Sequence, residues 1–426
     1  GHVLVFNEEA HAKKEAYWDL KKIASNSEKI KTDPETIKSF EALIEDAVTR
    51  RMVADVPLGA FLSGGIDSSL VVALMQKNSL QKINTFSIGF GEKNYNEAQY
   101  AKAVAEHVGT NHHELYVSDQ AALDVIPHLA QYYDEPFADS SQIPTYLVSK
   151  LAREKVIVSL SGDGGDELFG GYTRYIFASH YWKILSKIPA PLRSSLAFCL
   201  RLLKPQTYDQ LPLKMPNIGN NVYKLADSLE ARDPLSIYLS LVHLWPKPLD
   251  ILNIQSENHN TLQNNLLANT SEFPVFFERM QLADQLTYLP DDILTKVDRA
   301  SMAVALEARV PLLDHRVVER SWSLPLDAKI QGKVGKQLLR NMLYQYVPRT
   351  LIERPKMGFG IPLNAWLKGP LRAWAEDLLS PEQLSKSGLF KVEAVQNIWK
   401  SHLAGHNQQY RLWCVLMFQA WYSYWF

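Results

Sequence analysis

Several features that mark particular protein classes are scarce in this 426-residue chain. It has only two cysteines, Cys199 and Cys414, which lie far apart and share no metal-type spacing. They indicate a reducing compartment and no disulfide framework. The formal net charge is -1, so no global positive field exists to attract nucleic acid.

Long apolar runs are also missing. The most apolar stretch, residues 410–426, falls short of the roughly 20 apolar residues that a membrane span needs, and it includes Arg411 and Gln419. We therefore expect a buried C-terminal helix there. Residues 1–14 do not have the pattern of a secretory signal. Together these absences predict a cytoplasmic protein with neither nucleic acid nor a membrane among its partners.

What the chain does contain, from about residue 35 to 180, is an alternation of strands and helices. Apolar strands are expected at 57–63, 83–90, 112–117 and 156–160, and helical patterns at 33–52, 66–78, 96–109 and 121–134. This alternation predicts an α/β fold, a parallel sheet flanked by helices. After Tyr172 strand signals fade and helical segments dominate. We expect a linker at 1–34, a sheet domain at 35–180 and a mostly helical part at 181–426.

The stretch LSGGIDSS (62–69) lies between an expected strand and an expected helix. The first turn of a helix has unpaired N–H groups and the positive end of the dipole, which together favour an anion. Gly64 and Gly65 allow close backbone approach, and Ser63 and Ser68 add hydroxyl donors. An aspartate in such a loop would repel a phosphate, so Asp67 implies Mg²⁺ bridging a pyrophosphate group. The alternative is a plain turn in which Asp67 or Ser68 caps the helix.

A second glycine-rich loop, SLSGDGGDELFGGY (159–172), follows the strand at 156–160. Its acids, Asp163, Asp166 and Glu167, would repel one another without a cation. The carboxyl end of a parallel strand is where open α/β sheets bind ligands, so this loop and Asp67 could complete an Mg²⁺ site. A solvated acidic turn is the alternative.

The two loops carry a resemblance to known families. SGGxDS after a strand resembles the pyrophosphate motif of the ATP-pyrophosphatase superfamily, whose members split ATP into AMP and pyrophosphate. No lysine follows the glycines, so the stretch is not a GxxxxGK[ST] loop. The second loop is similar to the signature of glutamine-hydrolysing asparagine synthetases. Residues 295–315, 354–362 (RPKMGFGIP) and 134–149 (DEPFADSSQIPTYLVS) also resemble segments of that family.

The resemblance implies a set of site residues in this chain. It places Leu62 and Ile88 around the adenine and ribose, Ser161 and Gly162 at the nucleotide, and Asp166 beside Asp67 at the metal-bound pyrophosphate. Lys356 would be the catalytic cation that contacts phosphate. Many asparagine synthetases have Glu where this chain has Asp163, a side chain expected to assist at the reacting carboxylate, so the acceptor is left open. Residues 134–149 are expected near the acceptor pocket, and Glu307 and Arg309 in a structural ion pair.

Family members begin with an N-terminal cysteine nucleophile and a glutaminase domain of roughly two hundred residues, and this chain has no cysteine before Cys199. Residues 1–20 resemble the hinge that follows the glutaminase. The expectation is a synthetase fragment that uses ATP, Mg²⁺ and ammonia, with the glutaminase domain of the full-length chain as partner and a homodimer as an open alternative.

The reaction expected from the resemblance is ATP-dependent amide synthesis. The carboxylate is activated to an acyl-adenylate with release of pyrophosphate, and ammonia derived from glutamine then forms the amide. L-aspartate is the default acceptor, and a uronic acid of a nucleotide sugar or surface polysaccharide is the alternative. From other classes, an RNA-modifying ligase should show a basic surface that the net charge does not favour. A non-catalytic scaffold would have no reason to keep Asp67, Asp166 and Lys356 together.

Overall fold

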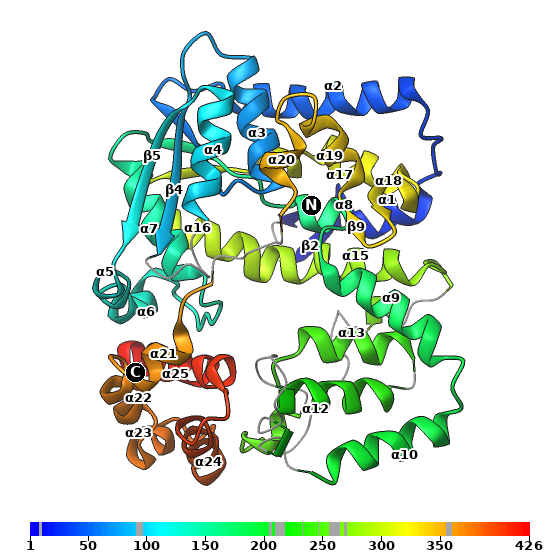
Figure 1. The fold of residues 1–426 in the computed structure, drawn as a ribbon. Helices are drawn as coiled ribbons and strands as arrows, with labels where there is room; N and C mark the ends of the chain where they lie inside the picture. The colour runs from blue at the N-terminus through cyan, green and yellow to red at the C-terminus, as the bar shows by residue number, and fades with distance from the viewer. Residues whose placement is uncertain are drawn as a thin grey trace.

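The computed structural model describes residues 1–7, 11–90, 97–203, 207–208, 218–231, 233–245, 247–254, 265–267, 271–354 and 360–426. Lys356 therefore lies outside the described residues. At the centre is a five-stranded sheet with strand order β5-β4-β3-β6-β7 (Figure 1). Its strands are β3 (Leu58–Phe61), β4 (Asn84–Phe90), β5 (Asn111–Val117), β6 (Val158–Leu160) and β7 (Glu307–Arg309). Every neighbouring pair is parallel, which confirms the predicted α/β fold.

The order of the strands explains where the helices lie. The chain moves from β3 to β4 to β5 in one direction and then returns to β6 on the other side of β3. Because crossovers between parallel strands are right-handed, helices of the outward steps and of the return step cover opposite faces. The outward helices are α3 (Ile66–Lys77) and α4 (Ala98–Val108), and the return helix is α7 (Gln142–Arg153). Helix α7 packs on β4 and on α16 (Thr295–Met302), whereas α3 packs on α4.

Local sequence rules explain the helix that precedes the sheet. Asp33 is the N-cap of α2 (Pro34–Arg51), and its side chain accepts a hydrogen bond from the backbone N–H of Thr36 at 2.8 Å. Pro34 occupies the first turn, where its missing N–H costs nothing. The helix buries Phe40, Ile44 and Ala47 at spacings of four and three, so one face packs into the core.

Two expectations about this region are corrected by the structure. Residues 121–134 were expected as one helix, but the chain forms α5 (Asp119–Leu123), a 3₁₀ turn (Ile126–His128) and α6 (Leu129–Tyr132). Pro127 lies between them, and its ring and missing N–H interrupt a continuous helix. The sheet also gains β7 from residues 307–309, within the region expected to be mainly helical. The predicted ion pair lies on that strand, with Arg309 Nε 2.7 Å from Glu307 Oε1.

The second half is mostly helical, as expected. Figure 1 shows two groups of helices below the sheet, one around α9–α13 and one at the C-terminus. The first group comprises α9 (Thr173–Leu185), α10 (Ala190–Arg201), α12 (Ile218–Leu229) and α13 (Pro234–Val242). The C-terminal group comprises α21 (Leu363–Lys368), α22 (Arg372–Leu378), α23 (Pro381–Lys386), α24 (Val392–Leu403) and α25 (Gln409–Trp425).

Other elements are α8 (Gly165–Phe169), α15 (Phe276–Leu286), the π-helical turn Leu289–Leu294, α17 (His315–Ser323), α18 (Leu326–Lys329), α19 (Gln337–Leu343) and α20 (Arg349–Ile352). Helix α17 packs on α2, and α19 packs on α3. The short hairpins are β1 (His2–Phe6) with β2 (Ala12–Ala16), and β8 (Ile330–Gln331) with β9 (Val334–Gly335). Helix α1 (Leu20–Asn26) follows β2 and buries Leu20 and Ala24.

The expected C-terminal helix is confirmed as α25. It buries Leu412, Trp413 and Leu416, among others, in a core cluster shared with α7 and β4. Among the described helices, none combines the length and apolar character that a membrane crossing requires.

Candidate active site

The loop at residues 62–65 connects β3 to α3 and has no capping side chain. Gly65 is the N-cap of α3, and no side chain forms a cap hydrogen bond, so the alternative in which Asp67 or Ser68 caps this helix does not hold. Ser63 and Ser68 instead join their hydroxyl oxygens across the loop at 3.0 Å. Gly64 has a φ of 70°, and a Cβ there would lie 2.9 Å from the backbone of Tyr100. The loop is thus a tight backbone turn that leaves the start of α3 facing a cavity.

The acidic loop lies beside it because β6 is the direct neighbour of β3. Leu58 pairs with Val158 and Ala60 with Leu160, so the carboxyl ends of the two strands coincide. The direction of the chain reverses between these strands, which makes this edge the switch point where open α/β sheets bind ligands. A Cβ on Gly162 would come within 2.6 Å of the Ser68 nitrogen. The acidic loop therefore packs directly on the first turn of α3.

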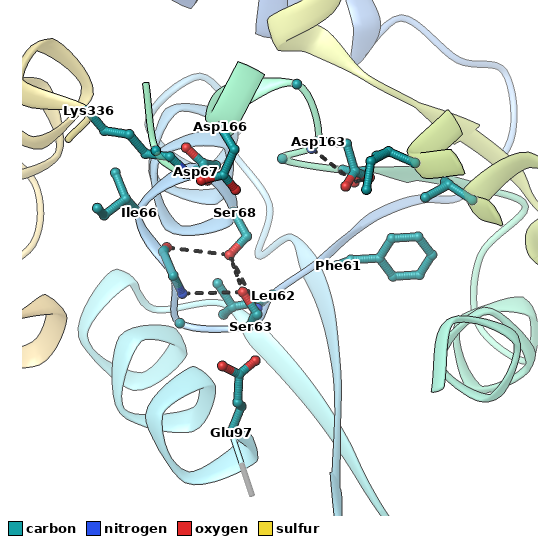
Figure 2. Close-up of a pocket in the computed structure, with 18 of the residues that line it drawn as sticks. Phe61, Leu62, Ser63, Ile66, Asp67, Ser68, Glu97, Asp163, Asp166 and Lys336 are labelled. Carbon is teal, nitrogen blue, oxygen red and sulfur yellow. Dashed lines mark hydrogen bonds and ion pairs between the residues drawn. The ribbon is translucent and has the colours of Figure 1, made fainter. Parts of the chain in front are cut away.

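One cation joins the two loops. Lys336 Nζ contacts Asp67 Oδ2 and lies 2.9 Å from Asp166 Oδ1, as Figure 2 shows at one end of the pocket. The Lys336 side chain is only 5% exposed. Burial alone would lower the pKa of this lysine, but the carboxylates of Asp166 and Asp67 outweigh burial and raise its pKa. Lys336 is therefore a charged ammonium held between two carboxylates.

Lys336 was not singled out from the sequence. It precedes α19, at the end of the β8–β9 hairpin, with a left-handed φ of 59°. Its backbone N–H donates to Phe169 O at 3.0 Å, which ties it to α8. Gly171 leaves room for it, since a Cβ there would overlap both Asp166 Oδ1 and Lys336 Cε. A lone lysine 269 residues from Asp67 gives no local signal of this contact.

The predicted Mg²⁺ ligands Asp67 and Asp166 do converge. Both carboxylates already share one cation position, taken by the Lys336 ammonium. No group of three or more metal-ligating side chains occurs among the described residues. The carboxylates of Asp67 and Asp166 fit a Mg²⁺ ion that is held by one or two carboxylates and completed by substrate phosphates. This is the usual arrangement of Mg²⁺ in nucleotide enzymes.

The cavity itself has a volume of about 330 Å³. Its wall includes most of the residues predicted from the sequence: Leu62, Ser63, Gly64, Gly65, Asp67, Ser68, Ser161, Gly162, Asp163 and Asp166. Ile88 is buried in the core and is not among the described residues that line the cavity, so its contact with adenine stays a prediction. The predicted role of Lys356 likewise stays untested.

Asp163 lies at a different end of the cavity from Asp67 and Asp166, near Phe61 (Figure 2). Its carboxylate accepts a hydrogen bond from the Ser161 hydroxyl, and burial raises its pKa. Lys296, in the first turn of α16, also lines the cavity and opposes part of that shift. Lys296 Nζ lies 3.0 Å from Asp139 Oδ2.

Several acidic residues lie around Lys296. Asp139 belongs to the segment 134–149 that was expected near the acceptor pocket, and Thr145 and Val148 of that segment line the cavity. Burial and the neighbouring Asp139 raise the pKa of Asp292 to about 6. Burial also raises the pKa of Glu167 to about 7. Asp163 and Asp292, both under the influence of Lys296, thus ionise less readily than in water.

A third side of the cavity is formed by Arg354, the first residue of the RPKMGFGIP segment. Its Nη2 donates to the carbonyl oxygen of Ser63 at 3.2 Å, and its Nη1 lies 3.7 Å from Glu97 Oε1. The guanidinium also lies 4.1 Å from the ring centroid of Tyr100. This arginine adds a fixed positive charge next to the LSGGIDSS loop.

Comparison with known proteins agrees with this geometry. The family model described as asparagine synthase matches residues 39–423. The glutamine-hydrolyzing asparagine synthetase 1 of Bacillus subtilis is 30% identical over 395 residues, covering 91% of this chain and 59% of its own. A protein of Mycobacterium tuberculosis, provisionally described as a glutamine-hydrolyzing asparagine synthetase, is 34% identical over 385 residues, covering 90% and 57%.

A more distant relative carries a different name. The amidase chyE of Penicillium rubens is 22% identical over 439 residues, covering 93% of this chain and 63% of its own. The chain thus spans less than two thirds of the length of each of these relatives. Since the family model covers nearly all of it, the chain belongs to the asparagine synthase family.

Proposed function

We propose that the protein is a ligase that forms a carbon–nitrogen bond and consumes ATP. The carboxylate oxygen of the acceptor attacks the α-phosphorus of ATP, the bond to the β-phosphate breaks, and pyrophosphate leaves. The nitrogen of ammonia then attacks the acyl carbon, AMP leaves, and one proton is released. In the full-length protein, ammonia would come from glutamine through a glutaminase domain, as the names of the relatives suggest.

The observation that carries this proposal is the convergence of Asp67, Asp166 and Lys336 at the carboxyl ends of β3 and β6. Bound Mg²⁺ would neutralise charge on the pyrophosphate. Lys336 supplies a second, permanent cation at the same place, where charge develops on the departing group. Geometry supports Lys336 as a candidate for the catalytic cation, while the candidacy of Lys356 rests on family resemblance.

Asp163 and Lys296 line the part of the cavity that we assign to the acceptor. Holding the acceptor carboxylate against the α-phosphate would contribute roughly 7–11 kcal/mol through positioning alone, if the two groups reach near-attack geometry. The Asp163 carboxyl, whose pKa burial raises, would lie next to the acceptor carboxylate. Lys296 offers the same carboxylate a positive charge.

The acceptor we favour is L-aspartate, which would give asparagine. A specific observation supports the alternative, a uronic acid on a nucleotide sugar or surface polysaccharide. Asp163 stands where many asparagine synthetases have Glu, so its carboxyl is one methylene further from a small acceptor. Both acceptors are carboxylates and share the adenylation step.

Pyrophosphate release with ATP, Mg²⁺ and ammonium chloride tests the proposal, with L-aspartate compared with uronic acids and their nucleotide sugars. We expect release that depends on a carboxylate acceptor, with the amide formed in equal amount. Release with aspartate supports asparagine synthesis, and release only with a sugar acid supports the alternative. Absence of acceptor-dependent release throughout would contradict the proposed reaction.

A further inference from the structure

Helix α10, at the edge of the helical part and away from the sheet in Figure 1, has its larger apolar side chains on the outside. Leu192, Phe198 and Leu202 are 61%, 65% and 64% exposed, and Leu196 and Leu203 are about half exposed. The buried positions are Arg193 and Ala197, four residues apart. A surface helix normally turns its apolar face inward, so this one is reversed.

Polar contacts on the inner side of α10 hold the helix in this orientation, with its apolar side chains outward. Arg193 donates to the carbonyl oxygens of Ile188 and Ala231 at 3.1 and 2.6 Å. Arg201, at the end of the helix, pairs with Asp227 of α12 at 2.6 Å and with Glu230, directly after α12, at 2.5 Å. These contacts hold α10 on α12, so the helix cannot rotate its leucines into the core without breaking them.

The chain segment that contains α9 and α10 has basic residues but no acidic ones. Residues 168–208 contain no aspartate or glutamate, although the chain has 46 acids in 426 residues. Lys183 and Lys187, at the end of α9 and in the turn that leads to α10, are exposed, as is Ile184 between them. Within the described part of the chain neither lysine forms an ion pair. The acids that contact α10, Asp227 and Glu230, are both paired with Arg201. Apolar side chains flanked by lysines without ion-pair partners fit an anionic lipid surface.

We propose that the outer face of α10, with Lys183 and Lys187, docks the protein on an anionic membrane surface. The helix would lie in the interface, with Leu192, Leu196 and Phe198 among the acyl chains and the lysines at the headgroups. This revises the expectation that no membrane partner exists, and it concerns contact with a membrane, not a span. A second copy of the chain is a poorer fit, because a two-fold interface would bring lysines together while Asp227 and Glu230, the acids beside α10, already pair with Arg201.

Co-sedimentation with vesicles tests the docking. The 426-residue chain is mixed with phosphatidylcholine vesicles that contain about 30 mol% phosphatidylglycerol, or none. We expect binding to the anionic vesicles that weakens as salt is raised. Leu196→Glu with Phe198→Glu should lower the partition coefficient by about tenfold or more. Replacing Lys183 and Lys187 by Ala should lower it by roughly fivefold for each lysine.

The matched control is Val53→Glu with Leu80→Glu, which changes two other exposed apolar side chains, 77% and 108% exposed, outside α9 and α10. It should leave binding unchanged, and circular dichroism would check that all variants fold. Equal binding to both vesicle types, or unchanged binding of the Leu196/Phe198 variant, would overturn the proposal. Sedimentation velocity adds a further outcome: a dimer that this variant dissociates would assign the face to a second copy and also overturn it.

Discussion

The two ends of the cavity differ in how their charges are balanced. At the end that we assign to pyrophosphate, Lys336 bonds to both Asp67 and Asp166 and offsets one of their two negative charges. At the acceptor end, Lys296 pairs with Asp139, while Asp163 and Asp292 have raised pKa values. The first arrangement keeps a net negative charge, so it would bind pyrophosphate together with Mg²⁺. The second suits a carboxylate that must be bound and then react. Variants at each end should therefore fail in different ways.

The largest effect is expected at the pyrophosphate end. Asp67→Asn should lower the rate of acceptor-dependent pyrophosphate release by about 10²–10³-fold, since it removes a carboxylate that would hold Mg²⁺ at the reacting phosphates. Asp119→Asn is a matched control, because Asp119 also lies in the first turn of a helix but on an exposed surface. Steady-state pyrophosphate assays on both variants measure the difference. Equal rates for the two would show that Asp67 has no part in the chemistry.

The two candidate lysines give the next comparison. Lys336→Met should lower the rate by on the order of 10²-fold, and it also leaves two nearby carboxylates without their ammonium, at a cost of about 3–5 kcal/mol in unfolding free energy. Added Mg²⁺ should restore part of this stability in urea unfolding, since it can occupy the same cation position. Lys356→Met is the companion variant. A severe loss with Lys356→Met and little change with Lys336→Met would return the role to Lys356.

At the acceptor end the effect should appear in KM. Lys296→Met should raise the acceptor KM by about 10–100-fold, as expected when a charge-assisted hydrogen bond of about 1.5–3 kcal/mol is lost. The KM for ATP should change little, because Lys296 pairs with Asp139, whereas Lys336 is the lysine bonded to Asp67 and Asp166. Initial rates over a matrix of both substrates separate the two constants. A raised ATP KM with an unchanged acceptor KM would contradict our assignment of the two ends.

The smallest expected effect concerns Glu167 and pH. Because burial raises its pKa to about 7, the folded state binds this proton more tightly than the unfolded state does. The folded protein is thus stabilised at low pH, and this contribution is lost as pH rises from about 4.5 to about 7, by on the order of 3 kcal/mol. Glu167→Gln keeps the acceptor for the Tyr172 hydroxyl, which donates to Glu167 Oε1 at 2.6 Å, and removes the titration.

Urea unfolding at pH 5 and pH 8 measures this difference. The wild type should lose more stability over that interval than the Glu167→Gln variant, while Glu307→Gln, at an exposed ion pair, should follow the wild type. Parallel pH dependence in wild type and Glu167→Gln would show that Glu167 is ionised in the folded state throughout.

The parts of the site that were predictable are those written in contiguous sequence. Residues 62–69 and 159–172 concentrate glycines and acids directly after apolar strands, so both the loops and their position at the sheet edge could be predicted. Pairing of β3 with β6 then brings Asp67 to Asp166, as expected for neighbouring parallel strands.

What could not be predicted depends on tertiary contacts. Lys336 reaches the loops from a hairpin 269 residues after Asp67, and its left-handed backbone is not typical of lysine. Strand β7 is three residues long and begins and ends with a charged residue, so it lacks the apolar pattern of a buried strand. The reversed face of α10 likewise follows from its packing on α12, since a helical pattern alone does not say which side is covered.

The central claim is that this cavity adenylates a carboxylate, and isotope transfer tests it most directly. The acceptor is labelled with ¹⁸O in its carboxylate and incubated with ATP, Mg²⁺ and ammonium chloride, and the nucleotide products are analysed by mass spectrometry. Our account predicts AMP that carries one ¹⁸O from the acceptor for each amide formed. Unlabelled AMP, or ADP with the label in inorganic phosphate, would contradict it.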